Sequence, residues 1–157
     1  MNLPPETRYA IREFIPEDLD AIRTLFREYA VIVASGICFS SFERELAELP
    51  GSYKPLLLAF AGDRLAGCAA LKHLDSTSAE MKRLYVRPEF QSLGLGRELT
   101  ERIIAEARSR GYRLLRLDTL PHLDRAIAMY RRRGFYEIPR YADNPAAAIC
   151  FELPISR

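Results

Sequence analysis

The sequence predicts a mixed α/β fold, with helices and a mixed sheet in a single domain that spans residues 1–157. Apolar residues alternate along the chain between helical spacing and strand-like runs, and turn residues separate these segments. The resulting order is strand, two helices, three strands, helix, strand, helix and two strands, without an internal repeat or a low-complexity linker. Apolar residues make up 48% of the 157-residue chain, which is enough for a hydrophobic core.

The first half of the chain is predicted to hold one strand, two helices and a hairpin, in the order 9–14, 16–30, 41–49, 56–61 and 65–73. Pro16 stands where a helix begins, and the apolar residues that follow it keep helical spacing. Ser40 and Glu43 fit a capping box at the start of the second helix. Gly62 and Asp63 fit the turn of the hairpin.

The second half is predicted to alternate between strands and helices, in the order 79–86, 94–109, 112–119, 123–133, 136–138 and 147–153. In its first helix, apolar residues recur every four positions and predict a stripe that faces the core: Leu95, Leu99, Ile103 and Ala107. Gly111 and Gly134 stand where helix C-caps are expected.

The most informative feature is the turn Val86-Arg-Pro-Glu-Phe-Gln-Ser-Leu-Gly-Leu-Gly-Arg97 between a predicted strand and a predicted helix. Such a turn leaves N–H groups unpaired at the helix start, and its glycines let the backbone approach an anion. A P-loop would need Lys after Gly96, where Arg97 stands, and a dinucleotide fingerprint would need a third glycine, where Leu99 stands. The turn therefore predicts a phosphate or pyrophosphate site built of backbone. An ordinary helix start, in which the glycines serve only the turn, is the alternative.

The string from Leu84 to Gly96 resembles the pyrophosphate loop of the GNAT superfamily, the acetyl-CoA-dependent N-acetyltransferases. The segment Arg125 to Phe135 resembles the same family's Ala-x-x-x-Tyr-x-x-x-Gly-Phe helix, and the element order is that of the GNAT fold. This resemblance implies a mostly antiparallel mixed sheet, splayed in the middle and flanked by about four helices. It also implies acetyl-CoA as co-substrate, direct transfer to a primary amine in a ternary complex, and no metal.

The resemblance further implies which residues hold the cofactor. They are Leu84, Tyr85 and Val86 along the pantetheine arm, Gln91, Ser92, Leu93, Gly94, Leu95, Gly96 and Arg97 around the pyrophosphate, and Ala126, Arg132 and Arg133 on the later helix. The alternative for the run Arg131–Arg133 is an ordinary solvated helix end, where positive charges interact favourably with the helix dipole. Leu123 stands where the family usually has an asparagine, so one cofactor hydrogen bond is in doubt, with His122 or Asp124 as substitutes.

Tyr130 and Glu80 are the candidate catalytic residues. Tyr130 matches the family's general-acid tyrosine, and a phenol can give a proton to a departing thiolate. Its alternative is a core tyrosine that shares a helix face with Ile127. Glu80 stands where some family members carry a catalytic glutamate that takes the proton of the amine. Its alternative is an ion-paired glutamate with Lys82 on the same strand face.

The acceptor is expected between the connection of the first two helices and the segment 140–145, with Phe39, Tyr141 and Asn144 as candidate contacts. The alternative is that these residues only close loops, because Asp143-Asn144-Pro145 is a turn signal by itself. No acidic cluster indicates a polycationic acceptor. Small-molecule amines and peptide amines therefore both remain open, as does a homodimer.

Composition argues against several other classes of protein. A net charge of +2, from 23 basic and 21 acidic residues, gives no reason to expect a nucleic-acid partner. The basic run Arg131–Arg133 is the local feature that leaves nucleic-acid binding as an alternative. Three widely spaced cysteines predict neither a disulfide framework nor a zinc site. No apolar run suits a membrane span and no signal-peptide core is present, so we expect a cytoplasmic protein. A Gly-x-Ser-x-Gly elbow is absent, which argues against a serine hydrolase. A non-catalytic acyl-CoA sensor is the main rival to the enzyme.

Overall fold

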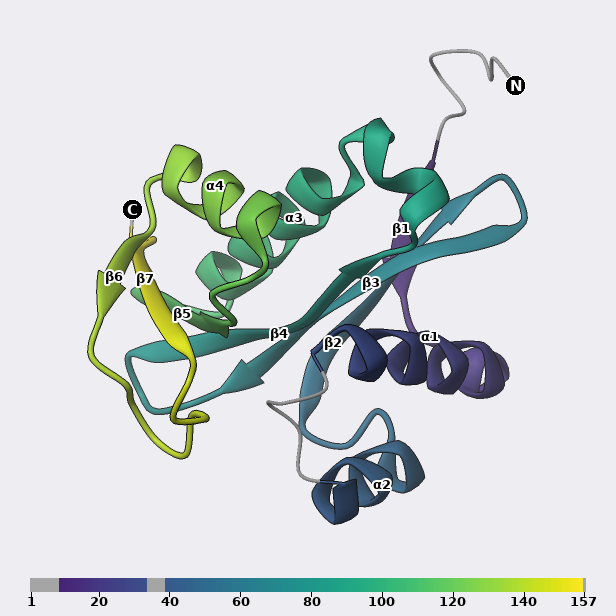
Figure 1. Ribbon diagram of the computed structural model, residues 1–157, viewed down its shortest axis with the longest axis horizontal. Helices are drawn as coiled ribbons and strands as arrows, with labels where there is room; N and C mark the ends of the chain where they lie inside the picture. The colour runs from purple at the N-terminus through teal and green to yellow at the C-terminus, as the bar shows by residue number, and fades with distance from the viewer. Residues whose placement is uncertain (1–8, 34–38, 157) are drawn as a thin grey trace.

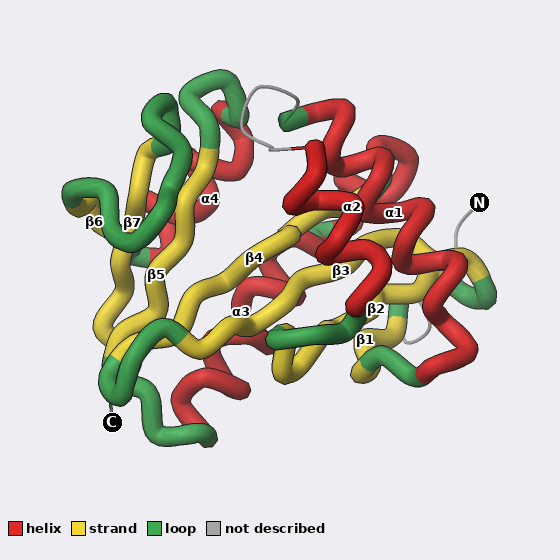
Figure 2. The backbone as a smooth tube through the Cα atoms, turned by 90° about the horizontal axis from the view of Figure 1, so that it is seen from below, coloured by secondary structure: helices red, strands yellow, loops and turns green. Residues whose placement is uncertain are grey.

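The computed structural model describes residues 9–33 and 39–156 as a seven-stranded sheet with helices on both of its faces (Figure 1). The strands are β1 (Ala10–Glu13), β2 (Tyr53–Ala61), β3 (Arg64–His73), β4 (Ser78–Val86), β5 (Leu114–Thr119), β6 (Tyr136–Ile138) and β7 (Ile149–Pro154). The helices are α1 (Leu19–Ile32), α2 (Phe39–Glu48), α3 (Leu95–Ser109) and α4 (Asp124–Arg133), with short 3-10 helices η2 (Pro16–Asp18) and η4 (Pro88–Leu93). Helices α1 and α2 lie on one side of the sheet and α3 and α4 on the other (Figures 1 and 2).

The sheet has the order β1-β2-β3-β4-β5-β7-β6, and every neighbouring pair is antiparallel except β4 and β5. The parallel pair is short, because its register runs only from Ser78 opposite Leu114 to Glu80 opposite Arg116. Beyond Glu80 the two strands separate, while β5 stays paired with β7 as far as Thr119. The predicted splayed, mostly antiparallel sheet is therefore confirmed.

A bulge deforms β4 close to the point where it leaves β5. Two residues of β4, Arg83 and Leu84, together face the single residue Ala69 of β3. Arg83 has a φ of 57°, a conformation that side-chain-bearing residues rarely adopt. Gly67 allows β3 to approach closely here, because a Cβ at that position would lie 2.6 Å from the backbone oxygen of Tyr85. The bulge therefore directs neighbouring side chains of β4 into the region between the separated strands.

Hydrophobic layers on the two faces of the sheet fix these elements. On one face the predicted stripe of α3 is confirmed, since Leu95, Leu99, Ile103 and Ala107 are all fully buried. On the other face the helical spacing after Pro16 is confirmed by the fully buried residues of α1, which are Ile22, Leu25 and Phe26. No helix in the described part of the chain is both long and apolar enough to cross a membrane.

Some element bounds and local details differ from the predictions. Helix α2 begins at Phe39, so Ser40 lies inside the first turn and the predicted capping box is wrong. Strand β2 begins at Tyr53, ahead of the predicted start, because a register shift between Tyr53 and Leu56 accommodates Pro55, which has no N–H for the ladder. Within the predicted phosphate turn, residues 88–93 form the 3-10 helix η4.

Candidate active site

The start of α3 offers an open set of backbone donors. Gly94 precedes the helix with a φ of 76°, and this left-handed conformation suits a residue without a Cβ. The first backbone hydrogen bond of the helix runs from the N–H of Glu98 to the oxygen of Gly94, 3.1 Å away. The N–H groups of residues 95–97 precede that bond and point out of the helix end, toward any anion placed there. The side chain of Leu95 itself belongs to the core, so only its backbone is available.

Gln91 fixes the turn instead of standing free. Its Nε2 donates to the backbone oxygen of Val86 at 3.0 Å, and its Oε1 accepts a hydrogen bond from Arg125 of α4 at 3.4 Å. The buried ring of Phe90 anchors η4 from below, whereas Ser92 is exposed. These contacts connect β4, η4 and α4 around the start of α3.

Strand β4 presents an edge without a β5 partner beside the separated strands. Its pairing with β5 ends at Glu80, although residues 85–86 still pair with β3 on the other side. Leu84 lines the gap, whereas the hydroxyl of Tyr85 donates to Glu28 of α1 at 3.2 Å. An extended ligand arm can use such an edge as an added strand would.

The basic run at the end of α4 has partners within the protein. Arg133 forms an ion pair with Glu101 of α3, and Arg131 lies 3.6 Å from Glu137 and over the ring of Phe151. Arg132 is exposed, and no ion pair is recorded for it within residues 9–33 and 39–156. Arg133 is therefore engaged in packing α4 against α3, which favours the structural interpretation of that residue.

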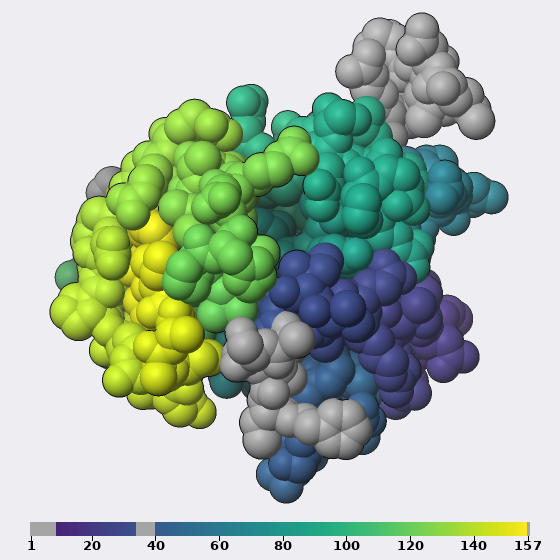
Figure 3. All heavy atoms as spheres, viewed as in Figure 1, coloured from purple at the N-terminus to yellow at the C-terminus, as the bar shows by residue number. Residues whose placement is uncertain are grey.

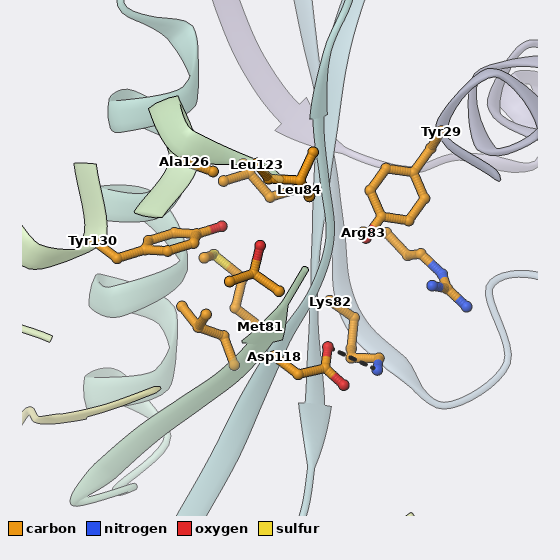
Figure 4. Close-up of a pocket in the computed structure, with 11 residues that line it drawn as sticks. Tyr29, Met81, Lys82, Arg83, Leu84, Asp118, Leu123, Ala126 and Tyr130 are labelled. Carbon is orange, nitrogen blue, oxygen red and sulfur yellow. Dashed lines mark ion pairs between the residues drawn. The ribbon is translucent and has the colours of Figure 1, made fainter. Parts of the chain in front are cut away.

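Between the separated ends of β4 and β5 lies a small hollow of about 40 Å³. Its lining includes residues of β4, β5, α4 and the position just before α4 that Figure 4 shows: Met81, Lys82, Leu84, Asp118, Leu123, Ala126 and Tyr130. The hydroxyl of Tyr130 points from α4 into the hollow, toward Leu84 (Figure 4). In the space-filling view a recess opens between α4 and the segment of η4 and α3 (Figure 3).

Tyr130 is held as a neutral phenol. Its side chain is 5% exposed, and its ring packs edge-on against Phe135 at 5.6 Å and lies 6.1 Å from Phe151. Burial raises the pKa of Tyr130 above its ordinary value. Among the described residues, no side-chain hydrogen bond engages its hydroxyl, so the proton is free to face a ligand in the hollow.

A larger cavity of about 420 Å³ adjoins this hollow on the side of α1 and α2. It is enclosed by α1, α2, the strands β3 to β5 and the segment 142–148. Six residues line both spaces: Tyr29, Lys82, Arg83, Asp118, Thr119 and Leu123. The cavity and the hollow are therefore neighbouring spaces that share one wall.

Two carboxylates lie on the floor of the cavity with a lysine between them. Glu80 is buried, and its Oε2 accepts a 2.5 Å hydrogen bond from the hydroxyl of Tyr141. Asp118 accepts a 2.8 Å hydrogen bond from Nδ2 of Asn144. The Nζ of Lys82 lies 3.8 Å from an oxygen of each. Tyr141 and Asn144, which the sequence predicts as acceptor contacts, hold the two carboxylates in place. Asn144 lines the cavity, whereas Tyr141 is not among its lining residues.

Asp118 was not among the sequence candidates. It stands two residues after Arg116, which faces Glu80 across the β4–β5 pair, so the alternation of strand 112–119 already places Asp118 on the face of Glu80. The alternation does not predict that β4 and β5 separate beyond Glu80. This separation places Asp118 at the hollow between the two strands. Phe39 begins α2, and its side chain and residues 34–38 lie outside the described part of the chain.

The upper wall of the cavity is held by Arg83 at the bulge. Its guanidinium makes a bidentate pair with Glu45 of α2, with N–O distances of 2.9 and 2.6 Å. The rings of Tyr29 and Phe42 flank it at 5.6 and 5.8 Å. Both charged side chains are mostly buried, so the pair ties α2 to the bulge of β4.

Comparisons with known proteins agree with this arrangement. The sequence profile of the Acetyltransferase (GNAT) family matches residues 19–135. An uncharacterised N-acetyltransferase of Schizosaccharomyces pombe is 34% identical over 143 residues, which cover 87% of this chain and 88% of the relative. The structure of the ribosomal-protein-S18-alanine N-acetyltransferase from Escherichia coli is 25% identical with a TM-score of 0.73, covering 95% of both chains. An acetyltransferase from Salmonella typhimurium, solved with its cofactor acetyl-CoA, shares the fold at 22% identity with a TM-score of 0.74, covering 94% of both chains.

Proposed function

The chain belongs to the acetyltransferase (GNAT) family and is an acetyl-CoA-dependent N-acetyltransferase, and we propose that it transfers the acetyl group directly to a primary amine in a ternary complex. The observation that carries this proposal is the Tyr130 hydroxyl, which points into the gap between β4 and β5. The thioester of acetyl-CoA occupies that gap, and the amine reaches it from the adjoining cavity. No covalent enzyme intermediate and no metal are required.

The cofactor is held mainly by backbone. The N–H groups of residues 95–97 receive the pyrophosphate, and Gly94 and Gly96 let it approach. The free edge of β4 at residues 84–86 pairs with the pantetheine arm, and Ala126 leaves room beside it in the hollow. Gln91 supports this site by its contacts with Val86 and Arg125, while the exposed Arg97 and Arg132 are cations available to a cofactor phosphate.

Tyr130 acts as the general acid. The tetrahedral intermediate collapses when the C–S bond breaks, and the leaving thiolate takes the phenol proton. The ordinary pKa of a tyrosine already lies well above neutral pH, and burial raises that of Tyr130 further, so the donor is present in nearly every molecule. Because the Tyr130 side chain is buried, its hydrogen bond to developing charge is stronger than it would be in water.

Asp118 accepts the proton of the amine in preference to Glu80. Asp118 lines both the hollow and the cavity, whereas Glu80 lines only the cavity. We assign Glu80 the role of a second carboxylate, which pairs with Lys82 and helps to balance its positive charge in the acceptor cavity.

The acceptor lies between α1, α2 and the segment 142–148, with Asn144 on its wall and Phe39 at the start of α2. The structural relative from Escherichia coli acts on the alanine of ribosomal protein S18. A short peptide with an N-terminal alanine is therefore the first acceptor to test, followed by small primary amines.

Thermal unfolding with and without excess acetyl-CoA, with ATP and NAD as controls, tests the cofactor site. A ligand at 100 times its Kd adds about 2.7 kcal/mol to the free energy of unfolding, which is several degrees in Tm for a chain of this size. A rise with acetyl-CoA alone supports the proposal, and equal curves for all ligands would contradict it.

Amine-dependent release of free CoA then separates the enzyme from a non-catalytic acyl-CoA sensor. The enzyme releases CoA faster when the acceptor is added, and Asp118→Asn should lower that rate far more than Glu80→Gln. Equal losses in the two variants would contradict the assignment of the base while leaving the transfer reaction intact.

A further inference from the structure

Lysine is rare in this chain, and its placement is uneven. The sequence has 20 arginines but only three lysines, which are Lys54, Lys72 and Lys82. Two of these three, Lys72 and Lys82, line the acceptor cavity, whereas Lys54 is exposed on β2. Lysine differs from arginine in one respect that matters here, since its amine can lose a proton and become a nucleophile.

Lys82 stands at the junction of the two spaces. It precedes the Arg83 bulge on β4 and lines both the hollow that holds the Tyr130 hydroxyl and the acceptor cavity. Its Nζ lies 3.8 Å from Oε1 of Glu80 and 3.8 Å from Oδ1 of Asp118, and its side chain is 20% exposed. Figure 4 shows Lys82 and Asp118 paired at the side of the hollow. A primary ammonium that belongs to the protein therefore occupies the place assigned to the amine of the acceptor.

We propose that Lys82 is a self-acetylation site, which takes the acetyl group from bound acetyl-CoA when no acceptor fills the cavity. This inference rests on the proposed function, because it uses the same hollow, the same base and the same acid. It assigns to the protein a modified form that the transfer reaction by itself does not require.

The step balances with the groups already in place. The Lys82 ammonium gives one proton to Asp118, which passes it to solvent, and the neutral amine forms a bond to the thioester carbonyl carbon. The C–S bond then breaks, and the second proton leaves the nitrogen as the sulfur takes a proton through Tyr130. The products are N-acetyl-Lys82, free CoA with its thiol, and one proton released to solvent.

Acetylation of Lys82 changes the charge of the cavity. The amide that forms is neutral, so Glu80 and Asp118 lose the cation that lies between them in the unmodified protein. The modified cavity gains one unit of negative charge and attracts a cationic amine more strongly than the unmodified cavity does. The two forms are therefore expected to differ in their KM for acceptors that carry a positive charge.

The test incubates the purified protein with acetyl-CoA and no amine, and follows intact mass and lysine-containing peptides over time. Uncatalysed acetylation favours the most exposed amine, so Lys54 is the internal reference. We expect Lys82 to be acetylated at least about tenfold faster than Lys54, with a rate constant independent of protein concentration, as an intramolecular reaction requires.

Variants separate the catalysed step from simple proximity. Lys82→Arg should abolish the fast modification, and the matched control Lys54→Arg should leave it unchanged. Tyr130→Phe should slow acetylation of Lys82 by roughly 100-fold without changing that of Lys54. Acetylation of Lys82 at the rate of Lys54, or no effect of Tyr130→Phe, would overturn the inference.

Binding measured on the same samples distinguishes this inference from the proposed function. If acetyl-CoA raises Tm or CoA is released with an amine, but Lys82 stays unmodified, self-acetylation fails and the transferase proposal stands. If acetyl-CoA does not bind at all, both fail together. A lower KM for a cationic amine in the acetylated protein, compared with the same protein before modification, supports the inferred change of charge.

Discussion

The two sides of the gap between β4 and β5 are built by different means. The side proposed for the cofactor offers backbone, since residues 95–97 and the edge of β4 present N–H groups and the packing behind them is apolar. The acceptor side uses charged side chains, in the Arg83–Glu45 pair and in Lys82 between two carboxylates. Under the proposed function, the difference means that acetyl-CoA is recognised by backbone geometry that a short motif encodes. Under the same proposal, the acceptor amine is recognised by side chains that come from distant segments of the chain.

The largest effect is expected on the acceptor side, from Glu45→Ala. The change leaves the Arg83 guanidinium mostly buried without its partner, which should cost about 3 kcal/mol of unfolding free energy and lower Tm by roughly 6–12 °C. Glu137→Ala is the matched control, because it breaks the exposed pair with Arg131 and should cost less than about 0.5 kcal/mol. Thermal and urea unfolding measure both, and equal losses would show that the Arg83 pair is not special.

The second effect concerns the acid. Tyr130→Phe keeps the ring contacts with Phe135 and Phe151, so Tm should change little. It removes the proton donor to the thiolate, so kcat should fall roughly 100-fold while acetyl-CoA binding persists. Steady-state rates at saturating acceptor measure this. Full turnover by the variant would return Tyr130 to the role of a core tyrosine.

The comparison also explains what the sequence alone could predict. Helix and strand positions, the stripe of α3 and the turn at Gly94 depend on neighbours within a few residues, so local spacing and turn chemistry reveal them. The place of Asp118 depends on strand separation at Glu80, and that of Tyr141 on a segment 61 residues from its partner. The ion pair of Arg83 with Glu45 joins residues 38 positions apart. The β4 bulge that orients Arg83 cannot be predicted from the composition of the strand. Side-chain pairs between residues far apart in the sequence therefore cannot be predicted from local spacing.

The third effect tests the backbone character of the cofactor side. A Cβ at Gly96 would meet only Met129 at 3.8 Å and Val86 at 4.0 Å, so both Gly96→Ala and Gly96→Glu should fold. Gly96→Glu places a carboxylate beside the pyrophosphate and should raise the Kd of acetyl-CoA at least tenfold, about 1.4 kcal/mol. Gly96→Ala should cost less. Calorimetric titration with acetyl-CoA measures the Kd of both variants. An unchanged Kd in Gly96→Glu would mean that the pyrophosphate binds elsewhere.

The smallest effect is a dependence of stability on pH through Glu28, which ties α1 to the end of β4. Hydrogen bonds from the Arg87 guanidinium lower the pKa of Glu28 below its ordinary value of 4.5. A carboxyl group with a lowered folded-state pKa stabilises the protein above its unfolded pKa, and this contribution is lost as pH falls through the folded value.

Glu28→Gln should therefore be less stable than the parent protein at pH 6, and the difference should shrink below about pH 4.5 as the carboxylate of the parent is protonated. The Glu28 side chain is 34% exposed, so solvent screening limits the effect to roughly 0.5 kcal/mol. Urea unfolding of both proteins from pH 6 to pH 3 measures the gap. A gap that stays constant would mean that Glu28 holds α1 through hydrogen bonds that Gln also makes. In that case the charge of this pair, unlike that of Arg83 and Glu45, would contribute nothing to how the acceptor side is held.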